Sequence, residues 1–278
     1  MALGLRFSTA LLSDTGRSRA NNEDAVVEDL ALGLLVLADG MGGYNAGEVA
    51  SRLAATTVRD AMRRHWPDIR PGEIESGSGL SSQTRLLRDA IVAAHAAVRE
   101  AAANEPAYAG MGTTIVCCLL CGDRASIAHV GDSRLYRLRD GQLGQLTRDH
   151  SLMEELIARG AYAREDAPRF VRRNIVTRAL GVEPGMEVDL IEETLQAGDL
   201  LLLCSDGLTD MVDDQTIALT LAREPDTLAG LASELVRIAN ERGGRDNISV
   251  ALARVEQTPP TTERWTRRVG RWLHGSRP

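Results

Sequence analysis

GTTIVCCLLCGDRASIAHVGDSRLYRLRDGQLGQL, residues 112–146, consists of apolar runs that are separated only by the short segments CGD, GDS and RDG. Each run predicts a strand, and the expected strands span residues 112–120, 124–130, 134–138 and 142–146. Asp140-Gly141 is a typical hairpin turn between the last two. Connections this short join antiparallel neighbours, because parallel strands need a crossover of a dozen or more residues. The stretch therefore predicts an antiparallel sheet in the middle of the chain.

The remaining apolar patterns place further strands and long helices around this stretch. The expected strands span residues 5–14, 31–38, 187–192, 200–204 and 248–255. Apolar residues at helical spacing predict helices at residues 46–65, 83–104, 213–223 and 226–241. A Pro/Gly/Ser-rich linker, 67–82, separates the first two helices, and 150–169 is typical of a helix followed by a polar loop. Strands in hairpin-like groups and helices in pairs favour an α+β fold with helices covering antiparallel sheets.

The composition is that of a soluble globular protein and excludes several classes of function. Of the 278 residues, 44% are hydrophobic and 26% are charged, which is enough apolar material for a sizeable core. A net charge of −7 argues against a nucleic-acid binder, which must neutralise phosphates. All 32 cationic side chains are arginines, so Walker-type phosphate loops and Schiff-base chemistry are excluded. No stretch resembles a signal peptide or a membrane span, and we expect a cytoplasmic protein.

The cysteines do not predict a metal site or a disulfide. Cys118 and Cys121 have CxxC spacing but lie in an apolar run that is typical of a strand. Residues three apart in a strand point to opposite faces, so these two thiols cannot bind one ion together. We expect buried, unreactive thiols and a reducing compartment.

Acidic residues stand at the ends of the predicted strands, often followed by glycine. The segments LADG, GDS, SDG and RDN contribute Asp39, Asp132, Asp206 and Asp246, and NED contributes Glu23 and Asp24. Carboxylates that converge at strand ends repel one another unless a divalent cation is bound between them. A set made only of oxygen ligands suits Mg²⁺ or Mn²⁺ better than Zn²⁺. Two such ions about 3.5–4 Å apart can activate a water and bind a phosphate oxygen.

Two other residue types would complete a phosphate site of this kind. Gly40 and Gly207 would allow the backbone to turn sharply and bring a carbonyl to the metal. Arg19 precedes the acidic pair and could bind a phosphate with two hydrogen bonds. Taken singly, each feature has a simpler interpretation: a DG pair is a turn, Asp132 a cap, Arg19 a solvated charge, and His150 a neighbour of a helix N-cap. Only the ordered set favours a metal centre.

The ordered set resembles a known family. Its motifs are SDTGRSRANNEDA, LADGMGGYNAGEVAS, GMGTTIV, HVGDSRLYRLRDGQL, LTRDHS, RNIVTRALG, GDLLLLCSDGLTDMV and GGRDNISV. In this order they resemble the metal-dependent (type 2C, PPM) serine/threonine protein phosphatases, the bacterial stand-alone branch above all. The resemblance covers residues 5–255. It implies a four-layer αββα fold, in which two antiparallel β-sheets pack as a sandwich flanked by antiparallel helix pairs.

The resemblance also implies a role for each acidic residue. By the family pattern, Asp39 bridges two metal ions, Gly40 offers a carbonyl, and Asp206 and Asp246 complete the first metal's ligands. The remaining assignments are Glu23 and Asp24 beside the second metal, Asp132 with Asp206 at a third, weaker metal, and Arg19 on the substrate phosphate. Arg19, Asp39 and Asp206 would thus be the catalytic residues. Met41 stands where many eukaryotic members carry a histidine proposed as general acid.

We therefore expect a Mn²⁺- or Mg²⁺-dependent phosphatase that acts on phosphoserine and phosphothreonine by attack of a water or hydroxide bridging two ions. Two alternatives remain open: a non-catalytic phosphoprotein-binding regulator of this fold, and a two-metal phosphodiesterase. The expected partners are phosphorylated proteins, including a Ser/Thr kinase and its substrates, with no nucleic acid. We expect a monomer with a catalytic domain at residues 1–256. The loop 161–173 would border the active site and influence substrate choice.

The last residues differ in character from the rest of the chain. Residues 257–278 form a basic tail in which Trp265, Val269, Trp272 and Leu273 would share one helical face. Such a segment could bind a membrane surface or an acidic partner. The favoured interpretation is that the tail packs on its own domain or frays.

Overall fold

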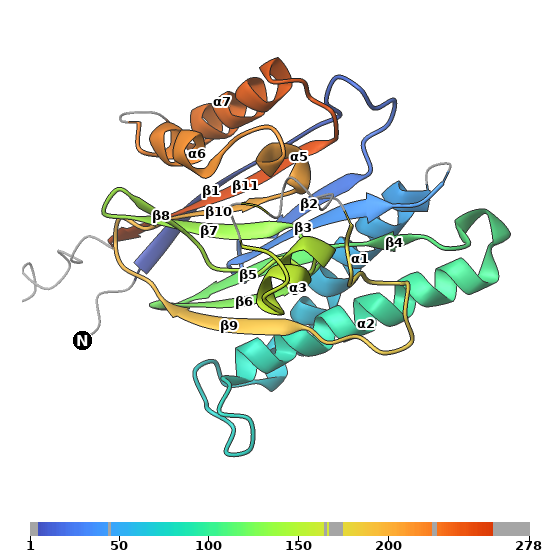
Figure 1. Cartoon of the computed structure of the whole chain (residues 1–278). Coiled ribbons are helices and arrows are strands. Elements are labelled where there is room, and N and C mark those ends of the chain that lie inside the picture. The colour runs from blue at the N-terminus through green and yellow to red at the C-terminus, as the bar shows by residue number, and fades with distance from the viewer. Residues whose placement is uncertain (1–4, 44–45, 164–165, 167–174, 224–226, 258–278) are drawn as a thin grey trace, which may run out of the picture.

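The chain folds into two antiparallel β-sheets that lie face to face between two layers of helices (Figure 1). The computed structural model describes residues 5–43, 46–163, 166, 175–223 and 227–257. The α+β sandwich flanked by helices agrees with the fold that the sequence predicts.

The first sheet has the strand order β2-β3-β5-β6-β9, with β4 paired to β3. Its strands are β2 (Asp24–Asp29), β3 (Leu34–Met41), β4 (Gly112–Thr113), β5 (Ile115–Cys121), β6 (Arg124–Val130) and β9 (Asp189–Thr194). Helices α1 (Ala46–His65) and α2 (Ser82–Asn104) cover its outer face (Figure 1).

The second sheet has the order β1-β11-β10-β7-β8. Its strands are β1 (Leu5–Asp14), β7 (Arg134–Arg139), β8 (Gln142–Gln145), β10 (Leu200–Cys204) and β11 (Ile248–Gln257). Helices α6 (Asp214–Leu221) and α7 (Leu228–Glu241) cover its outer face. The short helices α3 (Leu152–Ala158) and α5 (Asp206–Thr209) lie near one end of the sandwich, and 3₁₀ turns occur at Trp66–Asp68 and Pro106–Tyr108.

The alternation of side chains in β5 shows how one strand serves two cores. Ile115, Cys117 and Leu119 pack against α1 and α2. Val116, Cys118 and Leu120 point the other way and pack between the two sheets. This period of two requires apolar residues at every position of a central strand. Burial raises the pKa of Cys118 to about 12, and Cys117, Cys118 and Cys204 are buried as predicted. Cys121 differs from the prediction, because it is only half-buried at the end of β5.

Most predicted elements agree with the structure to within a few residues. Strand β1 and helix α1 have the predicted bounds, and Asp140 and Gly141 adopt the positive φ angles of 50° and 76° that their hairpin turn requires. The prediction of a single strand at 112–120 was wrong, because Thr114 separates β4 from β5. The prediction also missed β2 and α5.

One difference concerns the end of β3, which carries Asp39. The buried strand predicted to end at residue 38 is β3, which continues through Asp39 and Gly40 to Met41. Asp39 therefore lies within a paired strand and not in the turn after it. Its carboxylate is positioned by the sheet itself.

Some predictions concern parts of the chain outside the description. Most of the 161–173 loop and all of the tail beyond Gln257 lie outside the described residues. In the part that is described, no helix combines the length and the apolar character needed to cross a membrane.

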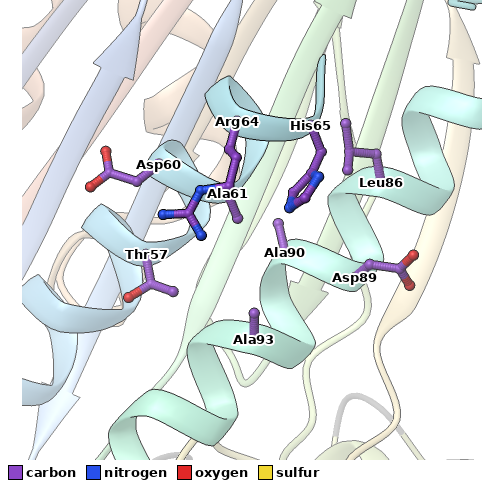
Figure 2. A pocket seen from close by; sticks show the side chains of 9 residues that line it. All are labelled: Thr57, Asp60, Ala61, Arg64, His65, Leu86, Asp89, Ala90 and Ala93. Carbon is purple, nitrogen blue, oxygen red and sulfur yellow. The ribbon is translucent and has the colours of Figure 1, made fainter. Parts of the chain in front are cut away.

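A shallow groove lies between α1 and α2 on the outer face of the first sheet (Figure 2). It encloses about 400 Å³, and small side chains such as Ala61, Ala90 and Ala93 leave the space open. Its lining begins at Thr57, ten residues along α1 from Gly47, which packs against Gly40. At 1.5 Å per residue, Thr57 lies about 15 Å along the helix axis from Gly47.

Candidate metal centre

Asp24 and Asp39 lie opposite each other on two neighbouring strands of the first sheet. They are register partners in the antiparallel pair β2 and β3. The backbone N–H of Gly40 donates to the carbonyl oxygen of Glu23 at 3.1 Å, which holds the NED segment against the ADG segment. Strand pairing thus brings together carboxylates that are fifteen positions apart in the sequence.

Asp206 and Asp246 come from neighbouring strands of the second sheet. Asp206 begins α5 just after β10, and Asp246 stands just before β11, which is hydrogen-bonded to β10. A Cβ atom added to Gly207 would lie 1.9 Å from the carbonyl oxygen of Asn247, so only glycine allows these two segments to approach. The SDG and RDN motifs therefore meet through backbone contact.

The prediction that Gly40 and Gly207 provide sharp turns was wrong. Neither glycine adopts a positive φ, and Gly40 lies inside strand β3. A Cβ atom at Gly40 would lie 2.1 Å from the carbonyl oxygen of Gly47 and 2.6 Å from that of Glu23. Glycine is required here because the start of α1 and the NED segment pack against the strand.

Asp39 lies at the electrostatic centre of the set. Burial raises its pKa well above the ordinary value, and the charges of Asp24, Asp206, Asp132 and Asp246 raise it further. Burial likewise raises the pKa of Asp206, with contributions from Asp132 and Asp246. The structure thus brings the five aspartates predicted from sequence close enough to oppose one another's ionisation.

Two of these aspartates have an intermediate pKa. Burial raises the pKa of Asp24 to about 6, against the hydrogen bonds from Ser249 and Ser205. Burial and the charge of Asp149 raise the pKa of Asp132, only 7% exposed, to about 6. The Oδ1 atom of Asp24 is buried and accepts no hydrogen bond from the described residues. A buried carboxylate oxygen without a donor is suited to a cation.

Arg19 and Glu23 lie at the rim of the carboxylates. Arg19 Nη2 donates to Asp246 Oδ2 at 2.7 Å, and its side chain is 51% exposed. This hydrogen bond, together with the charges of Asp246, Glu23 and Asp39, raises the pKa of Arg19. The guanidinium thus contacts the acidic set and remains half exposed, as a phosphate-binding group must be.

Several residues that support these carboxylates were missed in the sequence analysis. Thr114 Oγ1 accepts from the backbone N–H of Asp39 at 3.1 Å, and Ser205 Oγ donates to Asp24 Oδ2 at 2.9 Å. Asp210, one turn after Asp206, adds a further negative charge that raises the pKa of both Asp206 and Asp132. Short polar side chains of this kind give no periodic signal in a sequence.

Asn247 holds the loop that carries Arg19 and Glu23. Its Oδ1 accepts from the backbone N–H of Glu23 at 2.8 Å, and its Nδ2 donates to the carbonyl oxygens of Thr15 and Asn21, each at 2.9 Å. The side chain is 5% exposed. Its position directly after Asp246 in the RDN motif was the available signal.

Replacing Asn247 with alanine should therefore weaken both the loop and the site. We expect unfolding free energy to fall by about 2–3 kcal/mol, because buried backbone groups lose their partners. We expect kcat/KM for a phosphopeptide to fall by about 10²-fold as Arg19 loses its position. Urea unfolding and steady-state kinetics measure the two effects. A kcat/KM within twofold of wild type in Asn247→Ala would contradict the positioning role.

The donor set fits divalent ions that prefer oxygen. Aspartate and glutamate carboxylates and the Gly40 carbonyl are the ligands that Mg²⁺ and Mn²⁺ prefer. The nearest thiol, Cys204, is buried and has its pKa raised to about 12, which removes it as a thiolate nucleophile. The arrangement therefore favours hydrolysis by an activated water over covalent catalysis by a thiolate.

Comparisons with known proteins point to one family. The family model described as Protein phosphatase 2C matches residues 16–253. A serine/threonine phosphatase, stp, of Listeria monocytogenes is 40% identical over 249 residues, which cover 88% of this chain and 95% of that one. The serine/threonine protein phosphatase PstP of Mycobacterium tuberculosis is 40% identical over 257 residues, which cover 92% of this chain and 46% of PstP.

Solved structures agree with this likeness. The catalytic domain of PstP in complex with two manganese ions aligns with a TM-score of 0.76 and 38% identity, covering 91% of this chain and all of that one. Stp1, a serine/threonine phosphatase from Staphylococcus aureus, aligns with a TM-score of 0.79 and 35% identity, covering 92% of this chain and 98% of that one.

Proposed function

The chain belongs to the protein phosphatase 2C family, and from that membership we propose that it removes phosphate from phosphoserine and phosphothreonine in proteins, with Mn²⁺ or Mg²⁺ as cofactor. The observation that carries the proposal is the convergence of four aspartates from both sheets on a fifth, Asp39. Relatives named serine/threonine phosphatases, which match about nine tenths of the chain, support the same reaction.

We assign the predicted residues to the metal ions as follows. Asp39 would be shared by two ions and Gly40 would offer a carbonyl. Asp206 and Asp246 would complete the ligands of the first ion, and Glu23 and Asp24 would lie beside the second. Asp132 with Asp206 would hold a third, weaker ion. When bound, the ions supply an activated water and neutralise negative charge on the phosphate. The PstP structure that contains two manganese ions supports this cofactor choice.

The chain's own groups contribute binding and orientation. Arg19 would bind the phosphate with its guanidinium and orient phosphorus toward the acidic centre. The hydroxyl and backbone N–H of Thr114, the residue between β4 and β5, fix the backbone of Asp39. Met41 follows Gly40 and has no proton to donate, so a general acid at this position is excluded. A kinase of the same cell that phosphorylates serine or threonine would be the opposing partner, and we propose residues 1–256 as the catalytic domain.

Substrate class tests the proposal against its rivals. The protein should release phosphate from a phosphothreonine peptide and leave bis(p-nitrophenyl) phosphate, a diester, nearly untouched. Preferred cleavage of the diester would support a phosphodiesterase instead. Saturable peptide binding with no phosphate release in Mn²⁺ would support a phosphoprotein-binding regulator.

Arg19 provides a prediction for phosphate recognition. Arg19→Ala should raise KM for a phosphothreonine peptide by about 10–100-fold, because a charged hydrogen-bonding group is worth about 1.5–3 kcal/mol. Arg19→Lys should recover part of that loss, since it keeps the charge without the two-fold donor geometry. Steady-state kinetics at saturating Mn²⁺ measure the effect. Arg17→Ala, an exposed arginine on the same loop, is the control, and equal KM values for the two alanine variants would refute the role of Arg19.

A further inference from the structure

Two buried histidines and an aspartate lie close together beside the GDS loop that carries Asp132. The rings of His129 and His150 stack with centroids 4.8 Å apart and planes at 22°. Asp189 Oδ2 lies 3.3 Å from His150 Nε2 and 4.0 Å from His129 Nε2. The two histidines are 1% and 6% exposed. Neither histidine has a role in the reaction described above.

The spacing of this cluster resembles a metal site, but the tautomer of His150 opposes one. Among the described residues, these three offer ligand atoms that all lie within 4.8 Å of one another. His150 Nδ1, however, accepts a hydrogen bond from the backbone N–H of Gly131 at 3.1 Å. A neutral imidazole that accepts at Nδ1 carries its hydrogen on Nε2, so Nε2 has no lone pair for a metal ion. His150 Nε2 lies 3.3 Å from Asp189 Oδ2 and makes no hydrogen bond with the described residues.

His150 forms two hydrogen bonds with Gly131, the residue before Asp132. Its Nδ1 accepts from the Gly131 N–H, and its own backbone N–H donates to the Gly131 carbonyl oxygen at 2.9 Å. Gly131 has a φ of 108°, and a Cβ atom there would lie 2.6 Å from the Thr114 side chain. Thr114 in turn accepts from the backbone N–H of Asp39. Thr114 therefore links Gly131, the residue before Asp132, to the backbone of Asp39.

His150 is also bound to the chain that returns to β9. Its carbonyl oxygen accepts from the Thr177 N–H at 2.8 Å, and Ser151 bridges Val176. Asp189 Oδ1 accepts from Arg178 Nη1 at 3.2 Å, so the carboxylate beside His150 is fixed from the other side. One residue thus joins the GDS loop to residues 175–189.

We propose that His150 is a positioning residue for Asp132: the lone pair of its Nδ1 and its backbone N–H hold Gly131, and thereby set the Asp132 carboxylate for the third metal ion. The proposal rests on the metal assignment under the proposed function. Burial lowers the pKa of His150, against the nearby Asp189 charge, and this keeps the lone pair available at neutral pH. Burial lowers the pKa of the stacked His129 to about 4, so its ring adds no charge to the pair.

Two substitutions separate the two ring nitrogens. In His150→Asn, Oδ1 stands where Nδ1 was and can accept from Gly131. In His150→Gln, the amide reaches the position of Nε2 and leaves Gly131 without an acceptor. We expect the weakest Mn²⁺ site of His150→Gln to lose about tenfold or more in affinity, as for other residues that orient a metal ligand. His150→Asn should stay within about threefold of wild type, and KM for the peptide at saturating Mn²⁺ should not change in either variant.

Electron paramagnetic resonance of free Mn²⁺ during titration measures binding without requiring hydrolysis. Weak binding in His150→Gln with near-normal binding in His150→Asn supports the proposal. Equal losses in both variants, or no loss in either, overturn it. Because the readout is metal binding, inactivity of the wild type toward phosphopeptides would refute the proposed function and leave this test intact.

The wild-type protein offers a second test that needs no substitution. Long-range ¹H–¹⁵N correlation spectra of the histidine rings report which nitrogen carries the hydrogen. We expect His150 as the Nε2–H tautomer, both without metal and with Mg²⁺, which is diamagnetic. A hydrogen on Nδ1 would overturn the proposal even if both variants failed to fold.

Discussion

Replacing Asp39 or Asp206 with asparagine is expected to lower kcat toward a phosphothreonine peptide by at least about 10³-fold, which is about 4 kcal/mol of activation free energy. Each carboxylate comes from a different sheet, and each has its pKa raised by burial and by the other aspartates. Asparagine keeps the shape and removes the charge that a divalent ion requires. Phosphate release in saturating Mn²⁺ measures the loss.

The control for this prediction is a carboxylate far from the centre. Asp60 on α1 is exposed and pairs with Arg59, so Asp60→Asn should leave kcat unchanged. Far-ultraviolet circular dichroism should show the same helix and strand content in all variants. A kcat near that of the wild type in Asp39→Asn or Asp206→Asn would contradict the metal assignment.

Although Asp206→Asn should lower kcat, it is expected to raise the free energy of unfolding of the metal-free protein. A carboxyl group whose pKa is raised on folding binds more protons in the folded state, so its ionisation opposes folding as pH rises through that window. Each unit of pKa difference corresponds to about 1.4 kcal/mol. In EDTA at pH 7.5, Asp206→Asn should therefore have a larger free energy of unfolding than the wild type. Its advantage should shrink at pH 5, where the buried carboxyl groups of the wild type take up protons.

The comparison between variant and wild type is needed because other groups titrate in the same range. Burial lowers the pKa of His95, His129 and His150, and neutral buried histidines make stability rise with pH. These contributions are shared and cancel in the difference. Adding Mn²⁺ should reverse the order, because ion binding stabilises the wild type more. Urea unfolding at the two pH values measures this, and a metal-free Asp206→Asn less stable than wild type at pH 7.5 would refute the account.

The fold could be predicted where apolar residues alone determine an element. Central strands such as β5 and β10 are continuous apolar runs, and α1 has apolar residues at helical spacing over its whole length. Strand β2 was missed because DAVVED is a half-buried edge strand with acidic residues at both ends. Helix α5 was missed because four residues are too few for any periodicity.

The carboxylates of the site could be predicted from the sequence, but the residues that hold them in place by hydrogen bonds could not. Carboxylates at strand ends are costly without a cation, so their number and order point to a metal centre from the sequence. The hydrogen bonds of Asn247 and Ser205 join segments about 180 residues or more apart, and no local pattern reports them. His150 precedes the N-cap Ser151, as the sequence suggested, but its side chain contacts Gly131 and not the helix.

Hydrolysis of a phosphothreonine peptide with and without Mn²⁺, with EDTA as control, tests the central claim most directly. The claim is that the carboxylates at the strand ends hold the metal ions, and that these ions activate a water molecule for attack on phosphorus. We predict phosphate release that requires Mn²⁺, stops with EDTA and returns when the metal is restored. Release that persists in EDTA, or silence in a protein that binds Mn²⁺, would contradict the claim.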